Sequence, residues 1–176
     1  AATGVTMTGH VGSSHTGTSY GSQTFSWTGL GQNAAMKLVG GHQINIDNVT
    51  INYSGNGSPS NKWLFHTDGH NDWGDSTWDL NGGTTINMNG SGLVMYTSQY
   101  HGSGNYNVVM RNAATVTTSG SGNYIWMPLT AGNWGGFRMM VFENNGSISL
   151  GGTGDILAAF SSEDPASGGG GISFAN

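Results

Sequence analysis

A repeated pattern with a step of 32 residues constrains the fold of this chain more than any single residue does. Each copy contains two short runs of alternating apolar and polar residues, and the second run ends in a glycine-rich turn. The first run is found at residues 108–112, 140–144 and 172–176, and the second at 115–122 and 147–154, with looser copies at 50–57 and 85–92. Repeats of this length predict a solenoid built from strands, whose function usually lies on an extended surface.

The alternation within each copy predicts strands with one buried face. The residues expected to point inward form columns from copy to copy: Val108, Met140 and Ile172; Met110, Phe142 and Phe174; Ile51, Ile86, Val116 and Ile148; and Tyr53, Met88, Thr118 and Leu150. The outward columns are Thr50, Thr85, Thr115 and Ser147, and Asn52, Asn87, Thr117 and Ser149. A third strand follows the glycine turn. Three strands per copy, stacked about 4.8 Å apart, predict an all-β fold, a parallel (right-handed) β-helix solenoid with about 30–35 residues per rung.

Two side-chain contacts between rungs are expected where the first strand ends. Asn112, Asn144 and Asn176 would form a ladder at one corner, where asparagine tolerates the left-handed conformation and its amide can bond from rung to rung. Arg111 would lie over Glu143 on the outer face. Such an exposed ion pair contributes about 0.2–1 kcal/mol, so it indicates register rather than stability.

The repeat divides the chain into an irregular start and a regular remainder. Residues 1–43 contain strand-like runs that do not fall into phase, and we expect them to form an N-terminal cap or an irregular β segment. The β-helix rungs are expected at approximately 44–78, 79–109, 110–141 and 142–176. Because the pattern is still intact at Asn176, the sequence predicts a piece of a longer protein.

Composition argues against several classes of protein. Only 7% of the residues are charged, and 4 Lys plus Arg against 9 Asp plus Glu give a net charge of −5, which argues against a nucleic-acid partner. The sequence has no apolar run of about 18 residues or more, so no membrane-spanning helix is expected. There is no cysteine for disulfides or thiolate metal sites. We expect a secreted chain, its signal peptide already removed, whose stability comes from the repeat.

Polar, glycine-rich loops fall at one phase of successive rungs, at residues 98–107, 128–138 and 161–171. Loops at one phase stack on one side of a solenoid, and binding is expected there. The side chains expected to bind a ligand are Trp73, Tyr100, His101, Tyr106 and Trp134. Exposed Trp and Tyr offer flat apolar faces with a polar tip, which suit sugar rings or partner side chains. The alternative is that these rings fold back over the flank of the solenoid.

Residues 66–79 contain four of the nine acidic residues and two of the six histidines. Carboxylate oxygens and imidazole nitrogens are ligands for Ca²⁺ or Zn²⁺. The candidate metal ligands are Asp68, His70, Asp72 and Asp75, with Ca²⁺ as the cofactor if there is one. Their spacing matches neither an EF-hand nor a zinc-protease motif. The favoured interpretation is therefore a solvated, hydrogen-bonded insertion loop and no cofactor.

Support for catalysis is thin, and the sequence assigns no catalytic residue. β-Helical enzymes that cleave polysaccharides use clustered carboxylates, often beside Lys or Arg. The available cations are Lys37, Lys62, Arg111 and Arg138. No pair of acids recurs on a strand face, and no phosphate-binding glycine motif or nucleophile elbow is present. The candidate acids of an enzyme would be Asp68, Asp72, Asp75 and Asp79, two of them with carboxyl groups roughly 5–10 Å apart.

The segment Asn144-Asn145-Gly146-Ser147-Ile148-Ser149-Leu150-Gly151 resembles repeats in the passengers of type V autotransporters, in particular the large fusobacterial-type adhesins. The likeness extends in style over residues 44–176. It implies a virulence-associated protein that leaves the cell by type V secretion, is displayed at the cell surface and mediates adhesion. Anchoring in the outer membrane would depend on a C-terminal translocator beyond this sequence. The resemblance assigns no binding or catalytic residue.

These observations predict a non-enzymatic adhesin segment for cell–cell or cell–host attachment. Its partner would be a glycan or protein receptor on a host or bacterial cell, contacted through loops stacked on the β-helix; a rigid stalk is the purely structural version. The main alternative is a polysaccharide-degrading enzyme or tailspike-like hydrolase. An ice-binding solenoid is a further one, because Thr50, Thr85 and Thr115 form a short outward column beside Asn52 and Asn87.

Overall fold

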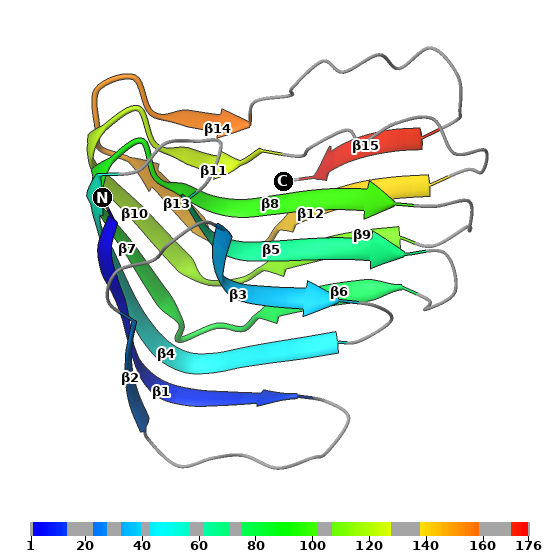
Figure 1. Ribbon diagram of the computed structural model, residues 1–176, viewed down its shortest axis with the longest axis horizontal. Helices are drawn as coiled ribbons and strands as arrows, with labels where there is room; N and C mark the ends of the chain where they lie inside the picture. The colour runs from blue at the N-terminus through cyan, green and yellow to red at the C-terminus, as the bar shows by residue number, and fades with distance from the viewer. Residues whose placement is uncertain are drawn as a thin grey trace.

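The computed structural model describes residues 2–13, 23–27, 33–39, 43–56, 62–70, 75–101, 107–127, 138–158 and 170–175. These residues form strands and turns, without any helix among them (Figure 1). The strands are β1 (Ala2–Ser13), β2 (Gln23–Trp27), β3 (Asn33–Val39), β4 (Gln43–Asn56), β5 (Lys62–His70), β6 (Ser76–Leu80), β7 (Thr85–Ser91), β8 (Val94–His101), β9 (Asn107–Asn112), β10 (Thr115–Ser121), β11 (Tyr124–Trp126), β12 (Arg138–Asn144), β13 (Ser147–Leu150), β14 (Ile156–Ala158) and β15 (Gly170–Ala175). The expected all-β class is confirmed.

Parallel strands lie in three rows, which we call the first, second and third faces. The first face contains the start of β4, followed by β6, β9, β12 and β15. The second contains the end of β4, followed by β7, β10 and β13, and the third contains β3, β5, β8, β11 and β14. From β6 onward the chain places one strand in each face before it returns to the first (Figure 1). Because β4 belongs to both, the first and second faces form one curled sheet.

The bend within β4 lies at Asn48, whose φ of 51° is the left-handed conformation. Asn48 is the one non-glycine residue with positive φ in the described parts of the chain. Asparagine adopts this conformation at lower cost than most residues, because its short polar side chain can bond locally. In later rungs a break between two strands makes the same corner, at residues 81–84, 113–114 and 145–146.

The register between strands is the one that the repeat predicts. Val116 of β10 pairs with Ile86 of β7 and with Ile148 of β13. The columns predicted for the first strand are also found, from β9 through β12 to β15. Side chains that bond between adjacent rungs are separated by 29 to 37 residues, for example by 30 for Thr117 and Asn87, by 32 for Asn112 and Asn144, and by 35 for Asn87 and Asn52, across the acidic insertion.

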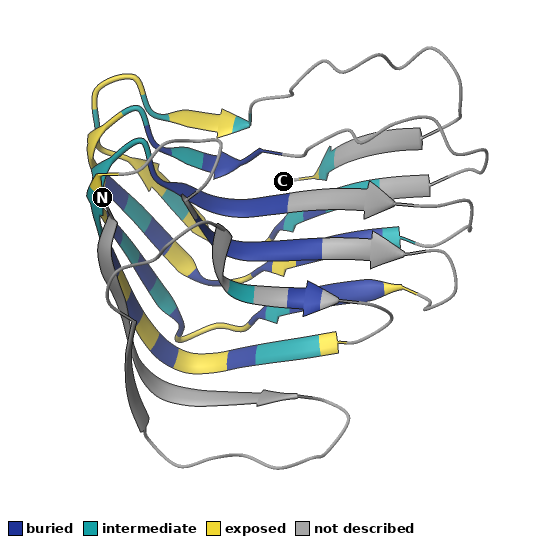
Figure 2. Ribbon diagram, viewed as in Figure 1, coloured by how far each residue is buried: buried dark blue, intermediate teal, exposed yellow. Residues whose placement is uncertain are grey.

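The inward columns form one apolar core (Figure 2). Its largest fully buried side chains include Trp78, Trp126, Tyr53, Tyr96, Phe65 and Phe142. Phe142 stacks on Phe174 of the next rung, with ring centroids 5.4 Å apart and planes inclined by 8°. Burying one large apolar side chain stabilises a fold by about 1.5–3 kcal/mol. The core therefore holds the rungs together far more strongly than any surface pair does.

Leu150 lies in its predicted column, in register with the buried Thr118, but 41% of it is exposed. It lies on β13, the last strand of the second face. Ile156 and Leu157 of β14, the last strand of the third face, are exposed as well. Columns of a stacked structure are buried by the strands on both sides, and among the described residues β13 and β14 have a neighbour on one side only.

Glycines make the turn from the second face to the third. Gly90 pairs with Gly55 on one side and with Gly120 on the other. A Cβ atom on Gly90 would lie 1.9 Å from the carbonyl oxygen of Gly55, and one on Gly120 would lie 2.0 Å from that of Gly90. Gly55 and Gly120 also have φ values of 110° and 107°. Both the conformation and the close approach of the rungs therefore require glycine here.

Asparagines link the rungs at the corner between the first and second faces. Asn112 Nδ2 donates to Asn144 Oδ1 at 2.8 Å, as predicted, while Asn176 lies outside the described residues. The expected left-handed conformation is wrong for Asn112 and Asn144, so amide hydrogen bonding alone accounts for the pair. Asn112 Oδ1 is buried and has no hydrogen-bond partner among the described residues. The position before it in the column is Leu80, whose side chain has no donor.

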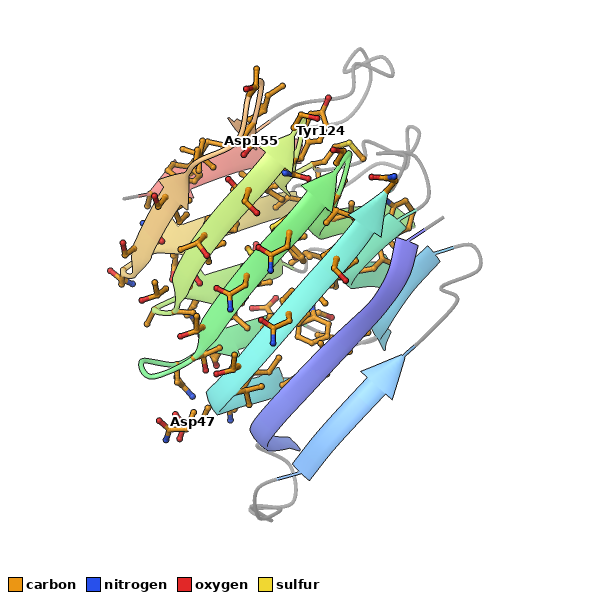
Figure 3. All side chains as sticks on the ribbon, turned by 90° about the vertical axis from the view of Figure 1, so that its left-hand side faces the viewer. Asp47, Tyr124 and Asp155 are labelled. Carbon is orange, nitrogen blue, oxygen red and sulfur yellow. The ribbon has the colours of Figure 1, made fainter. Side chains whose placement is uncertain are left out.

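A second side-chain link lies at the start of the third face. Asn123 Oδ1 accepts a hydrogen bond from the backbone amide of Leu93 at 3.0 Å, and Asp155 Oδ1 accepts one from the backbone amide of Asn123 at 2.9 Å. Asp155 Oδ2 also accepts from Thr118 Oγ1 and from the backbone amide of Gly152 (Figure 3). Burial alone would raise the pKa of Asp155, but the hydrogen bonds from Thr118, Asn123 and Gly152 together hold that pKa below its ordinary value.

The first 43 residues contribute an antiparallel edge as well as a parallel strand. β1 pairs antiparallel with β4, with register shifts between Ala2 and Gly4 and between Thr8 and His10, and β2 pairs antiparallel with β1. β1 therefore covers an edge of β4 that would otherwise present unpaired backbone groups. β3 pairs in parallel with β5 and is already part of the third face. The parallel pairing thus begins before residue 44. The sequence did not show this, because β3 does not carry the repeat pattern that marks the later rungs.

Two buried tyrosines should respond in opposite ways to loss of the hydroxyl group. Burial raises the pKa of Tyr53 well above its ordinary value, and its hydroxyl has no hydrogen-bond partner among the described residues. Tyr96 OH lies 3.2 Å from Thr67 Oγ1, which also accepts from Trp78 Nε1 at 2.8 Å. Tyr53→Phe should raise the free energy of unfolding by up to about 1 kcal/mol, whereas Tyr96→Phe should lower it by about 0.5–1.5 kcal/mol. Urea unfolding measures both, and equal losses would contradict this reading of the core.

Asp155 should make the stability depend on pH. Because its pKa is lower in the folded chain than the ordinary 3.8, its ionised form stabilises the fold. This contribution is fully present above the ordinary pKa and is lost as pH falls through the folded pKa. Asp155→Ala should therefore be less stable than the parent above about pH 5, and the two should converge as pH falls below the folded pKa. Melting midpoints across this range provide the measurement; a constant difference would contradict the linkage.

Candidate functional site

Two of the predicted ligand-binding residues lie beside the acidic segment. Tyr100 and His101 are the last residues of β8, where they pair in register with Gly69 and His70 of β5. The other three lie outside the described residues: Trp73, Tyr106 and Trp134. The stacked loops and the acidic segment were predicted as separate sites. The strand register instead places the end of β8, where the first loop begins, beside the end of β5, where the acidic segment lies.

The candidate metal ligands are partly placed. Asp68 and His70 lie near the end of β5, and Asp72 lies outside the described residues. Asp75 is exposed, and its Oδ1 accepts a hydrogen bond from the backbone amide of Asn107 at 2.8 Å, which ties the starts of β6 and β9 together. Among the side chains that the structure describes, no three His, Cys, Asp or Glu form a group able to hold a metal ion. Calcium binding at this segment stays the alternative to the favoured solvated, hydrogen-bonded loop.

A charged row crosses the outer side of the first face. Arg111 lies between two carboxylates: its Nη1 is 3.4 Å from Asp79 Oδ1 and its Nε is 3.2 Å from Glu143 Oε2. The pair with Glu143 was predicted; the pair with Asp79 was missed, although the same step of 32 residues joins them. Gln43 Nε2 also donates to Asp79. Asp79, one of the acids considered for catalysis, is thus held by a cation and an amide.

The outer side of the second face is an array of hydroxyl and amide groups, which we call the hydroxyl face (Figure 3). Its rows cross β4, β7, β10 and β13 and consist of Thr50, Thr85, Thr115 and Ser147; Asn52, Asn87, Thr117 and Ser149; Ser54, Asn89 and Ser119; and Asn56, Ser91 and Ser121. Every one of these residues is exposed or half-buried. The array contains no charged and no aromatic side chain. Its outward orientation confirms the two columns predicted from the sequence.

Hydrogen bonds between neighbouring strands fix the side chains of the hydroxyl face. The bonds run from Asn87 Nδ2 to Asn52 Oδ1 at 2.9 Å, from Thr117 Oγ1 to Asn87 Oδ1 at 2.9 Å, from Ser119 Oγ to Asn89 Oδ1 at 3.0 Å, and between the hydroxyls of Ser91 and Ser121 at 3.0 Å. They hold the polar groups at the spacing between strands, about 4.8 Å. The outward columns can be predicted from the alternation in the sequence. These hydrogen bonds cannot be predicted from it, because they depend on the rotamers of the side chains.

No family model matches this chain, and no curated protein or solved structure is significantly similar to it. Among the described residues, no helix has the length and apolarity needed to cross a membrane.

Removing the cation of the charged row should have a small effect that depends on salt. The Arg111 side chain is 49% exposed and that of Glu143 39%, although that of Asp79 is only 13% exposed, so Arg111→Met should lower the free energy of unfolding by about 1 kcal/mol at low ionic strength. The loss should shrink at about 1 M NaCl, where the Debye length is about 3 Å. Gln43→Met is the control, since it removes a neutral donor to Asp79. Urea unfolding at both ionic strengths provides the measurement, and a large loss that ignores salt would contradict the assignment.

Proposed function

We propose that this chain is a segment of a parallel, right-handed β-helix solenoid that serves attachment at a cell surface as part of an adhesin. The observation that supports it most is the in-register parallel pairing along three faces, with side chains 29 to 37 residues apart meeting between rungs. Each face then repeats similar residues from rung to rung. Such a structure offers long surfaces rather than a closed pocket, and long surfaces suit contact with a large receptor.

Surface display is supported by the resemblance of residues 144–151 to autotransporter repeats. In the structure these residues form the end of β12, the corner and β13. The side chain of Asn144 is buried, while Ser147 and Ser149 are exposed. Stacking of rungs would constrain the residue type at these three positions, because it buries the first and leaves the other two outside. Type V secretion, outer-membrane anchoring through a C-terminal translocator, and a glycan or protein receptor on a host or bacterial cell belong to the same proposal.

A non-enzymatic role is favoured over the hydrolase alternative by the bonding of two acids. Asp75 accepts a hydrogen bond from the backbone of Asn107, and Asp79 is paired with Arg111. Cleavage of a glycosidic bond needs two carboxyl groups that face the sugar. These two carboxylates are instead engaged by neighbouring strands of the stack.

The contact region that we propose lies at the ends of β5 and β8, where Tyr100 and His101 pair with Gly69 and His70. It would also include the loop residues Trp73, Tyr106 and Trp134 predicted from the sequence. This region is on the third face, away from the charged row and the hydroxyl face. Substitutions in this region can therefore test receptor binding without changing the charged row or the hydroxyl face.

Binding of the labelled chain to bacterial and mammalian cells, measured by flow cytometry, tests the proposal. We expect saturable binding that the double change Tyr100→Ala and His101→Ala weakens by about tenfold or more, because loss of an aromatic hot spot costs about 2 kcal/mol or more. Glu143→Ala on the first face is the matched control and should bind like the parent. No binding to any cell type or glycan array would refute attachment by this segment, and undiminished binding by the double variant would move the contact region elsewhere.

A further inference from the structure

The residue pattern of the hydroxyl face extends further than the sequence alone suggests, because the backbones of β1 and β2 pair in register beside β4. The first row becomes Thr24, Thr8, Thr50, Thr85, Thr115 and Ser147, and the second becomes Ser26, Thr6, Asn52, Asn87, Thr117 and Ser149. Between the rows lie only apolar residues: Phe25, Met7, Ile51, Ile86, Val116 and Ile148. The strands β2, β1, β4, β7, β10 and β13 thus each carry a polar–apolar–polar triplet with a hydroxyl or amide residue at both ends.

The strands that carry these rows lie side by side in one layer (Figure 3). Sheets ordinarily twist, and a flat one is stabilised by stacking or by ladders of side chains. The chain of hydrogen bonds from Thr117 through Asn87 to Asn52 is such a ladder, and it crosses three strands. The hydroxyl and amide groups are therefore held in place before any ligand arrives, which reduces the rotamer entropy lost on binding.

The spacing of the array sets the kind of ligand that can match it. Neighbouring strands are about 4.8 Å apart, and alternate residues along a strand are about 6.6 Å apart. The array is therefore a two-dimensional grid of neutral groups, most of which both donate and accept hydrogen bonds, as water does. A ligand that matches all of it must itself repeat in two dimensions at similar distances.

The chemistry of the face argues against other large ligands. Its described side chains carry no charge with which to hold anionic polymers or lipid headgroups, and no aromatic ring on which sugars could stack. They also lack the large apolar groups that anchor protein interfaces. What the face offers is a rigid lattice of hydroxyls and amides, with the methyl groups of several threonines between them.

We infer that the hydroxyl face is an ice-binding surface, whose ligand is the ordered water lattice of an ice crystal. The inference concerns a different face from the proposed receptor contact at the ends of β5 and β8. It does not depend on the attachment role, and each can fail without the other.

Thermal hysteresis and enrichment of the protein in slowly growing ice test this inference. The whole chain should show both activities. Thr115→Tyr should lose most of both, because one large ring within the first row, between Thr85 and Ser147, keeps the neighbouring groups from the ice surface. Thr115 is exposed and does not belong to the apolar core, so the variant should melt like the parent. Ala113→Tyr is the matched control: it adds the same ring two residues away, at an exposed corner outside the rows, and should retain both activities.

Three outcomes would overturn the inference. The first is a parent chain without hysteresis and without enrichment in ice. The second is a folded Thr115→Tyr variant with full activity; Thr50→Tyr, at another exposed position of the same row, decides the point if the first variant does not fold. The third is binding to insoluble neutral polysaccharides without any activity on ice, which would assign the face to a glycan.

Discussion

Stacking of like side chains in register is the interaction on which the rest of this structure depends. Each rung buries its apolar residues against the rungs beside it, as Val116 does between Ile86 and Ile148. A slip by one residue would exchange the buried and outward sets, since the side-chain period of a strand is two. The buried amide pair of Asn112 and Asn144 strengthens this choice, because a slip would leave polar groups unpaired in the core. The charged row and the hydroxyl face follow the same register on the outside.

One core thus supports surfaces that differ in chemistry. The first face carries the charged row around Arg111, the second carries the hydroxyl face, and the ends of β5 and β8 bring Tyr100 and His101 beside the acidic segment. Outward residues take little part in the core, so each face can change without disturbing the stack. The turn at Gly55, Gly90 and Gly120 is the opposite case, since the closeness of the rungs there excludes any side chain.

Much of the fold follows from the sequence because the repeat makes strand register visible. The inward columns, the pair of Asn112 with Asn144 and the ion pair of Arg111 with Glu143 all follow from a step of 32 residues. The sequence does not predict the left-handed bend at Asn48 or the place of β3 in the third face, because neither belongs to a recurring motif. The pairing of β1 with β4 was also hidden, since antiparallel strands reverse the order in which matching residues occur. For the candidate site, the register of the third face had to be seen before Tyr100 and His101 could be placed beside Gly69 and His70.

The antiparallel strand β1 makes the two ends of the curled sheet different. It occupies one flank of β4, so no further parallel strand can be templated from that flank. At the opposite flank, among the described residues, β13 bonds to β10 alone and its other row of amides and carbonyls points outward. Among the described residues β2 pairs with β1 alone, so this row of strands ends in an antiparallel edge at β2 and in a parallel edge at β13, and only the parallel edge continues the repeated register.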